Sequence, residues 1–250
     1  GTTCLNSVPS FKKLKSALKI KKPLDYLNNL KISDTNIKIE DCFIYQNYTP
    51  NPNCERMYFQ NENALKIDII RITIEKWKTK GLINENEYFY LLACLINAVP
   101  YISNITGVYG AYLKHWDKRT YDELKLEEPK IIKSKKIHTA YNGDANEIVK
   151  GQKVDLVYLD TPYNKRQYLP NYHLLETIAK YDYPIIKGKT GIRGYENQKS
   201  DYCSSLKVAD AYKDLLSNLN TRYVLISYNN EGLLTTEEMT NILKPFAKKG

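Results

Sequence analysis

The sequence lacks the cysteine pattern, the long apolar run and the histidine spacing that mark several classes of protein. Its five cysteines are scattered and none forms a C-x-x-C pair, which argues against both a disulfide framework and a zinc site. No apolar stretch approaches the roughly 18–20 residues that span a bilayer. The histidines, His115, His138 and His173, show no metal-ligand spacing. We therefore expect a cytoplasmic protein with reduced thiols, no membrane partner and no metal.

Acidic residues are also scarce relative to basic ones. The chain has 37 Lys and Arg residues against 28 Asp and Glu, a formal net charge of +9. The basic residues cluster at 12–22, 129–136 and 244–249. Such a surplus favours a polyanionic partner, most often nucleic acid, over the alternative of a merely solvated basic surface.

The first half of the chain carries helical signals. We expect an amphipathic helix over 10–31, interrupted at Pro23, and a short strand at 42–45. Apolar residues near 3.6-residue spacing predict a helix over 61–80. Gly81 follows in the position that commonly ends a helix.

A second helix is predicted to follow directly. Asn84 can cap its start, with Glu87 three residues on as the partner of a capping box. The helix is apolar nearly all round, which predicts burial, and Pro100 should bend or end it.

From residue 136 the pattern changes to alternating strands and helices. Strands are expected at 136–144, 154–160 and 222–232, and helices at 145–151, 172–181, 208–219 and 235–246. In VDLVYLD at 154–160, four apolar or aromatic residues run without alternation up to Asp160, which is typical of a strand buried on both faces of a parallel sheet. This alternation predicts the α/β fold class.

Polar residues follow three of the expected strands. Asp144 comes after HTAYNG, Asp160 comes after VDLVYL, and the polar segment 228–230 lies near the end of the strand that begins with YVLI. Ligands of open α/β sheets bind outside the carboxyl ends of the strands. The coincidence of three polar strand ends favours a ligand site, although each residue alone could simply cap a loop.

The segment Asp160-Thr161-Pro162-Tyr163 has the chemistry of a nucleobase pocket. A carboxylate and the backbone carbonyl of Thr161 are two adjacent acceptors, matched to an exocyclic amine. The ring of Tyr163 is matched to the face of a base. The sequence therefore predicts a pocket for an extruded nucleobase.

This segment resembles the (D/N)PPY signature of methyltransferases that modify exocyclic amines. Further blocks resemble one group, the Dam-like (alpha group) adenine-specific DNA methyltransferases of bacterial restriction–modification systems. The blocks lie at 48–59, 104–114, 159–182, 188–193 and 226–232. The resemblance implies an α/β, Rossmann-like S-adenosylmethionine-dependent methyltransferase fold, with a parallel-rich sheet flanked by helices and a mostly helical target-recognition subdomain.

The resemblance also implies roles for particular residues. The catalytic motif would be formed by Asp160, Thr161, Pro162 and Tyr163, with Tyr163 stacking on a flipped adenine. The cofactor, S-adenosylmethionine, would be held by Asp144, Ala145 and Asp160. The partners would be double-stranded DNA and a cognate restriction endonuclease that acts on the same site.

Three regions follow from the same resemblance. Residues 1–39 would be a basic remnant of the cofactor half, 40–135 the target-recognition region and 136–250 the catalytic α/β half. The expected DNA contacts are Arg56, Lys114, Arg119, Arg166, Lys189 and Arg193.

The chain departs from the family pattern at two places. It has no F-x-G-x-G cofactor loop, and Thr161 stands where the family has its first proline. The threonine makes the turn less rigid but adds an N–H and a hydroxyl. Two alternatives therefore stay open: a truncated, inactive relative that only binds DNA, and an amino-methyltransferase that acts on cytosine or RNA.

Overall fold

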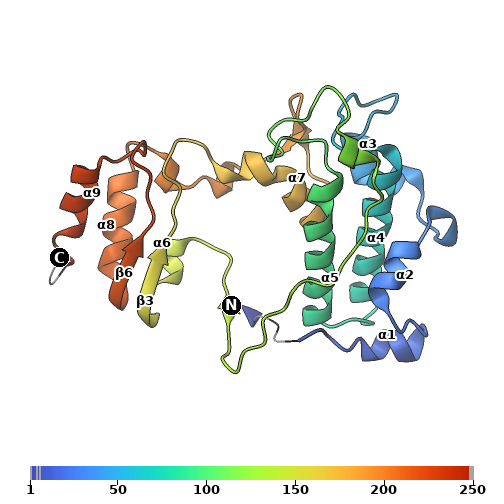
Figure 1. Ribbon diagram of the computed structural model, residues 1–250, viewed down its shortest axis with the longest axis horizontal. Helices are drawn as coiled ribbons and strands as arrows, with labels where there is room; N and C mark the ends of the chain where they lie inside the picture. The colour runs from blue at the N-terminus through green and yellow to red at the C-terminus, as the bar shows by residue number, and fades with distance from the viewer. Residues whose placement is uncertain (1, 4, 6, 248–250) are drawn as a thin grey trace. The chain divides into compact units, whose positions relative to one another are not determined.

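The computed structural model describes residues 2–3, 5 and 7–247 and divides them into two compact units (Figure 1). We call residues 5–137 and 170–194 the helical unit. The remaining described residues, 2–3, 138–169 and 195–247, form the α/β unit. Segment 5–39 thus groups with the expected recognition region, and segment 170–194, which the sequence placed in the catalytic half, joins the helical unit.

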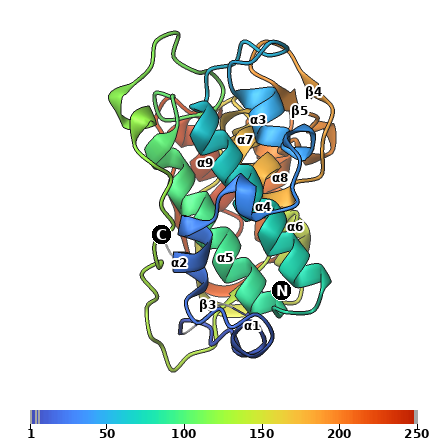
Figure 2. The same ribbon diagram turned by 90° about the vertical axis from the view of Figure 1, so that its right-hand side faces the viewer.

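The helical unit is built around two long helices that pack against each other, α4 (Asn61–Thr79) and α5 (Glu85–Ala98), seen side by side in Figures 1 and 2. Its shorter elements are α1 (Lys12–Ala17), α2 (Pro23–Asn29), α3 (Phe43–Tyr48), the 3-10 turns Ile32–Asp34, Ile39–Asp41, Val99–Ile102 and Lys118–Tyr121, and the strands β4 (Ile186–Lys187) and β5 (Ile192–Arg193). Helix α7 (Tyr168–Lys180) contributes most of its length to this unit.

The ends of α4 and α5 follow the local signals of the sequence. The N–H groups of Gly81 and Leu82 donate to the carbonyls of Lys78 and Trp77, both at 2.9 Å, which closes α4 with Gly81 at φ +64°. Asn84 and Glu87 exchange side-chain-to-backbone hydrogen bonds of 2.9 Å and start α5. Both predictions are confirmed.

Helix α5 is less buried than its composition suggested. It ends at Ala98, and Pro100 lies in the following 3-10 turn, so the prediction for its end is confirmed. One stripe, Phe89, Ala93 and Asn97, is exposed. These residues are four apart and lie on the face opposite the core, so the expectation of burial all round is wrong.

The strand expected at 42–45 is also wrong, because these residues enter helix α3. The carboxylate of Asp68, on α4, accepts the N–H groups of Ile44 and Tyr45 at 2.9 and 2.8 Å. These are donors of the first turn, which a helix leaves without partners of its own. A long-range carboxylate therefore supplies the cap that the local sequence lacks.

The α/β unit contains one parallel strand pair. Strand β3 (Lys153–Leu159) pairs with β6 (Asn220–Ile226), with Leu159 opposite Ile226. The other elements are α6 (Ala145–Ile148), the start of α7, α8 (Val208–Asn218), α9 (Thr236–Leu243), the 3-10 turns Glu196–Gln198 and Asp201–Cys203, and the antiparallel pair β1 (Thr2–Thr3) and β2 (Thr139–Ala140). The parallel arrangement of the 154–160 strand is confirmed.

The expected burial of β3 on both faces is wrong. Leu156 and Tyr158 are each 55% exposed, whereas Leu159 is 8% exposed. In the described part of the chain only β6 pairs with β3. The core of this unit, which contains residues of α8 and α9 with Tyr202 and Leu234, reaches the carboxyl end of β3 at Leu159. Strand β3 is thus packed against the core at its carboxyl end, which leads into the D-x-P-Y segment.

Candidate functional site

Asp160 stands directly at the carboxyl end of β3. The parallel pairing continues beyond the strands, since the N–H of Ser227 donates to the carbonyl of Leu159 at 2.9 Å. This bond places Asp160 beside the segment that follows β6. Asp160 is exposed, and within the described residues its carboxylate makes no hydrogen bond or ion pair. The strand end therefore presents an available acceptor.

The turn after Asp160 is tied down at two points. The hydroxyl of Thr161 is hydrogen-bonded to that of Tyr212, a fully buried residue of α8. The carbonyl of Tyr163 accepts the N–H of Leu233 at 2.8 Å. The carbonyl of Thr161 accepts no hydrogen bond from any described residue, and the side chain of Tyr163 is 37% exposed. The two acceptors and the ring expected from the sequence are thus presented on a fixed turn.

The segment after β6 is shaped by Tyr228. Its hydroxyl accepts the N–H of Leu234 at 3.0 Å, and the N–H of Gly232 donates to the carbonyl of Asn229 at 2.9 Å. A Cβ at Gly232 would overlap the ring of Tyr228, so this close approach requires glycine. The loop that holds the turn of Tyr163 through Leu233 is therefore itself tightly constrained.

Asp144 caps the short helix α6. Its carboxylate accepts the N–H of Asn146 at 2.9 Å. Asn146 in turn donates to the carbonyl of Ala211 at 3.0 Å and accepts the hydroxyl of Tyr202 at 2.8 Å. Helix α8 thus anchors both the segment of the expected cofactor residues and, through Tyr212, the turn after Asp160.

Tyr202 and Tyr212 were not among the residues expected at the site. Their rings meet edge to face, with centroids 5.0 Å apart, and burial raises the pKa of both hydroxyls, which keeps them protonated. Tyr202 lies in the 3-10 turn Asp201–Cys203 and Tyr212 in α8, and only the fold shows that their hydroxyls bond to Asn146 and Thr161.

The expected DNA contacts divide into two groups. Lys114, Arg166 and Lys189 have exposed side chains with no described hydrogen bond or ion pair. Arg166 lies in the α/β unit and the two lysines in the helical unit. These three cations are available to a ligand.

The other three candidates are engaged within the helical unit. Arg193 is 6% exposed and pairs with both carboxylate oxygens of Asp182, at 3.0 and 2.6 Å. Arg119 donates to the carbonyl of Ile105 and lies 3.8 Å from the carboxylate of Asp117. The guanidinium of Arg56 donates to backbone carbonyls of three residues. Their contacts are those of residues that hold the fold.

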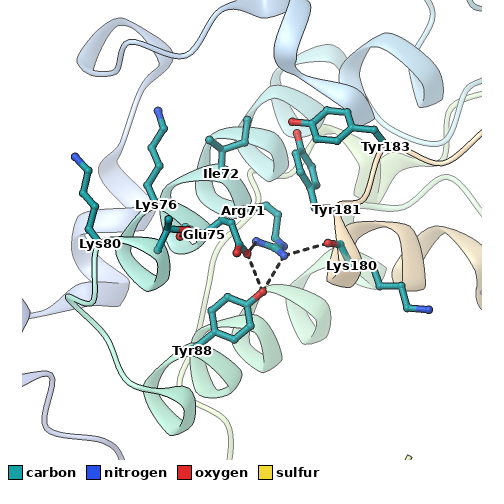
Figure 3. Close-up of a pocket in the computed structure, with 10 residues that line it drawn as sticks. Arg71, Ile72, Glu75, Lys76, Lys80, Tyr88, Lys180, Tyr181 and Tyr183 are labelled. Carbon is teal, nitrogen blue, oxygen red and sulfur yellow. Dashed lines mark hydrogen bonds and ion pairs between the residues drawn. The ribbon is translucent and has the colours of Figure 1, made fainter.

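The helical unit also has a pocket of about 480 Å³ between α4, α5 and the end of α7 (Figure 3). Arg71, which is 2% exposed, lies at its centre. Its guanidinium donates to the last carbonyls of α7, at 3.0 Å from that of Ala179, to Glu75 at 2.8 Å and to Tyr88 at 2.9 Å. Although partial burial opposes ionisation, the bonds from Arg71 and Tyr88 lower the pKa of Glu75. The arginine therefore ties three helices together.

Two further properties concern membrane-spanning proteins and metal-binding proteins, the classes that the sequence argued against. Among the described residues, no helix combines the length and apolarity that crossing a membrane requires. In the same part of the chain, no three His, Cys, Asp or Glu side chains gather as a potential metal site.

With this geometry in view, comparison with known proteins defines the class. Residues 12–242 match the D12 class of N6 adenine-specific DNA methyltransferases, and the chain belongs to this family. The match confirms the resemblance read from the D-x-P-Y segment and supports the α/β, Rossmann-like methyltransferase fold.

Particular relatives are similar over nearly the whole chain. The Type II methyltransferase M.FokI of Planomicrobium okeanokoites is 51% identical over 96% of this chain and 36% of its own length. The modification methylase StsI of Streptococcus sanguinis is 48% identical over 98% of this chain and also 36% of its own length. The Type II methyltransferase M.NlaIII of Neisseria lactamica is 42% identical over 82% and 61%. The chain thus spans about a third of the length of the first two relatives. No solved structure matches it.

Proposed function

We propose that the chain forms the catalytic part of a site-specific DNA methyltransferase, which transfers a methyl group from S-adenosylmethionine to N6 of adenine. The observation that carries this proposal is the turn at the end of β3. There the available acceptors of Asp160 and Thr161 stand beside the exposed ring of Tyr163, on a backbone tied to Tyr212 and Leu233. Family membership supports the same reaction.

The residues of the turn act by positioning and electrostatics. Asp160 and the carbonyl of Thr161 accept hydrogen bonds from the amine of a flipped adenine, and Tyr163 stacks on its face. As the amine nitrogen takes the methyl group, positive charge develops on it; the carboxylate stabilises that charge, and a proton leaves the nitrogen for solvent to give the neutral N6-methyl amine. S-adenosylmethionine, when bound, supplies the methyl group as an electrophile on a sulfonium.

The residues expected to bind S-adenosylmethionine have part of what a site for this cofactor requires. Asp144, Ala145 and Asp160 belong to one unit, and the carboxylate of Asp160 has no described partner. The carboxylate of Asp144 has one described hydrogen bond, the cap of α6. The chain has no F-x-G-x-G sequence, where glycines would allow the closest backbone approach. Cofactor binding is therefore measured separately from catalysis.

The biological setting is part of the proposal. Relatives named as Type II methyltransferases and modification methylases favour a restriction–modification system. We infer double-stranded DNA as the substrate, a cognate restriction endonuclease that acts on the same site, and a cytoplasmic location.

The decisive experiment compares Asp160→Ala with Asp155→Ala, a matched control that removes an exposed carboxylate from β3, the strand that Asp160 follows. Methylation of unmethylated genomic DNA is measured with labelled S-adenosylmethionine, and the product is identified by mass spectrometry. We expect N6-methyladenine, a loss of about a hundredfold or more in Asp160→Ala, and little change in the control. DNA affinity should remain similar in both variants.

Other results would favour the alternatives. Modified cytosine, or transfer to RNA alone, would replace the adenine assignment. Calorimetric titration with S-adenosylmethionine, with and without duplex DNA, tests the remaining alternative, a truncated relative that binds DNA without modifying it. DNA binding without cofactor binding or methylation would show that the chain only holds DNA. Full activity of Asp160→Ala would remove the pocket assignment.

A further inference from the structure

The turn between β4 and β5 is held from one side by side chains of distant segments. The two strands pair antiparallel and lie next to α3 (Figure 2). Residues 188–191, Gly-Lys-Thr-Gly, connect them, and the N–H of Gly191 donates to the carbonyl of Gly188 at 3.3 Å. Both glycines have positive φ, +70° and +68°, a region that glycine adopts without strain.

Three carbonyls of this turn, those of Gly188, Lys189 and Gly191, accept hydrogen bonds from side chains. The guanidinium of Arg56 donates to the carbonyls of Gly188 and Lys189, both at 3.0 Å. The hydroxyl of Tyr58 donates its one proton to the carbonyl of Tyr109 at 2.7 Å and lies 3.2 Å from the carbonyl of Thr190. The hydroxyl of Tyr48 donates to the carbonyl of Gly191 at 2.7 Å. The contacts of both tyrosines with the turn span more than 130 residues of sequence.

The supporting side chains are fixed and remain donors. Tyr48 and Tyr58 are fully buried, and burial raises the pKa of Tyr48 to about 12, so its hydroxyl stays protonated at neutral pH. A Cβ at Gly191 would lie 2.8 Å from Nε of Arg56 and 2.9 Å from the ring of Tyr48. The turn therefore rests on its support so closely that only glycine fits at residue 191.

This support fixes the direction of the N–H groups. In a trans peptide the N–H points opposite to the C=O of the same peptide unit, and no described peptide bond is cis. Because the carbonyls of Gly188 and Lys189 point at Arg56, the N–H groups of Lys189 and Thr190 point away from it. Neither N–H donates to any described residue.

The outward side of the turn is electropositive. Two successive N–H groups that point the same way form an anion-binding concavity. The side chains of Lys187 and Lys189 are exposed and make no described ion pair or hydrogen bond. The positive charge of Arg56 lies behind the peptide dipoles, aligned so that their positive ends face outward.

We propose that this turn is a phosphate-binding site, which binds one phosphodiester of the DNA backbone. The donors are the backbone N–H groups of Lys189 and Thr190 and the ammonium groups of Lys187 and Lys189. Arg56 is a positioning residue that holds the turn rather than a DNA contact. The proposal rests on the proposed function only in taking DNA as the source of the phosphate. Backbone N–H groups and lysines are common donors to DNA phosphates.

The direct test uses the whole chain labelled with ¹⁵N-lysine and ¹⁵N-threonine. Titration with a short duplex is expected to shift the amide signals of Lys189 and Thr190 downfield, more than those of Lys78 and Thr79 at the end of α4. In the variant Arg56→Lys, the ammonium group cannot replace the guanidinium that donates to the carbonyls of both Gly188 and Lys189. The variant should therefore show smaller shifts at Lys189 and Thr190, while its other amide signals keep the dispersion of a folded protein.

Salt dependence supplies a second readout. Each phosphate contact contributes about 0.9 to the slope of log affinity against log salt. We expect Lys187→Ala/Lys189→Ala to lower that slope by about 1. The control, Lys76→Ala/Lys80→Ala, removes two exposed lysines from the same unit and should change the slope less.

The outcomes separate this proposal from the proposed function. Failure to bind duplex at all would contradict the DNA substrate. Duplex binding with unmoved amides of Lys189 and Thr190, or equal slopes in the two double variants, would overturn the turn assignment alone. Shifts with inorganic phosphate but not with duplex would assign the site to a free phosphate and overturn the DNA source.

Discussion

The hydroxyl of Thr161 is hydrogen-bonded to the hydroxyl of Tyr212, which is buried in α8. Thr161 stands where the family signature has proline, and this contact gives a physical reason for the exchange. A proline ring restricts φ and stiffens the turn from within. Here a side chain 51 residues away holds the turn from outside.

This contact predicts that restoring the family residue is harmful. Thr161→Pro would leave the buried hydroxyl of Tyr212 without a partner, at a cost of about 1–3 kcal/mol in the free energy of unfolding. The displaced turn should also slow methyl transfer, roughly tenfold to a hundredfold. Urea unfolding and a methylation assay measure the two effects.

A double variant provides the control. Thr161→Pro/Tyr212→Phe removes both partners and keeps the ring that packs against Tyr202. It should therefore recover most of the lost stability. Equal or greater stability of the single Thr161→Pro variant, compared with the natural chain, would contradict the role of the hydrogen bond.

Arg71 is expected to stabilise the helical unit. Arg71→Met would leave the last carbonyls of α7 without their donors, so the free energy of unfolding should fall by about 2–4 kcal/mol. The ion pair itself contributes little, because the side chain of Glu75 is 50% exposed. Lys76→Ala, an exposed neighbour in the same helix, should stay within about 0.5 kcal/mol. Denaturant unfolding that ranks the two variants equally would refute this role.

His173 should make stability depend on pH. Burial lowers its pKa from 6.5 to about 4, with Arg56 and Arg193 acting in the same direction and the bond to the carbonyl of Tyr109 opposing it. Between these values the unfolded chain binds a proton that the folded chain does not. Stability from this residue is therefore complete above pH 6.5 and is lost as the pH falls toward 4. The loss should approach about 3 kcal/mol.

The measurement compares the natural chain with His173→Gln, which keeps an N–H donor for the carbonyl of Tyr109. Asp68, whose pKa burial raises to about 7, changes stability in the opposite direction over the same range. Both proteins carry Asp68, so the difference between their unfolding free energies isolates the histidine. A difference that does not change between pH 7 and 4 would show that His173 does not titrate in this way.

Parts of the structure with local causes could be predicted from the sequence. The exchange between Asn84 and Glu87 and the glycine that ends α4 each depend on residues a few positions apart. The D-x-P-Y segment after an apolar run is local in the same sense, and it indicated the family that the comparisons confirm. Local spacing sets which backbone groups and side chains can meet within one turn.

Tertiary contacts decided the rest. Residues 43–48 have strand-forming side chains, yet they form helix α3, because the carboxylate of Asp68 accepts the N–H groups of Ile44 and Tyr45 in its first turn. Arg56 and Arg193 were expected from the sequence to contact DNA. In the fold, the guanidinium of Arg56 donates to backbone carbonyls and that of Arg193 pairs with Asp182. Composition records that a charge is present but not which acceptor lies nearest to it. The sequence by itself thus determined the family and the helix ends, because their causes are contiguous, whereas the partners of each buried polar group depend on segments that only the folded chain brings together.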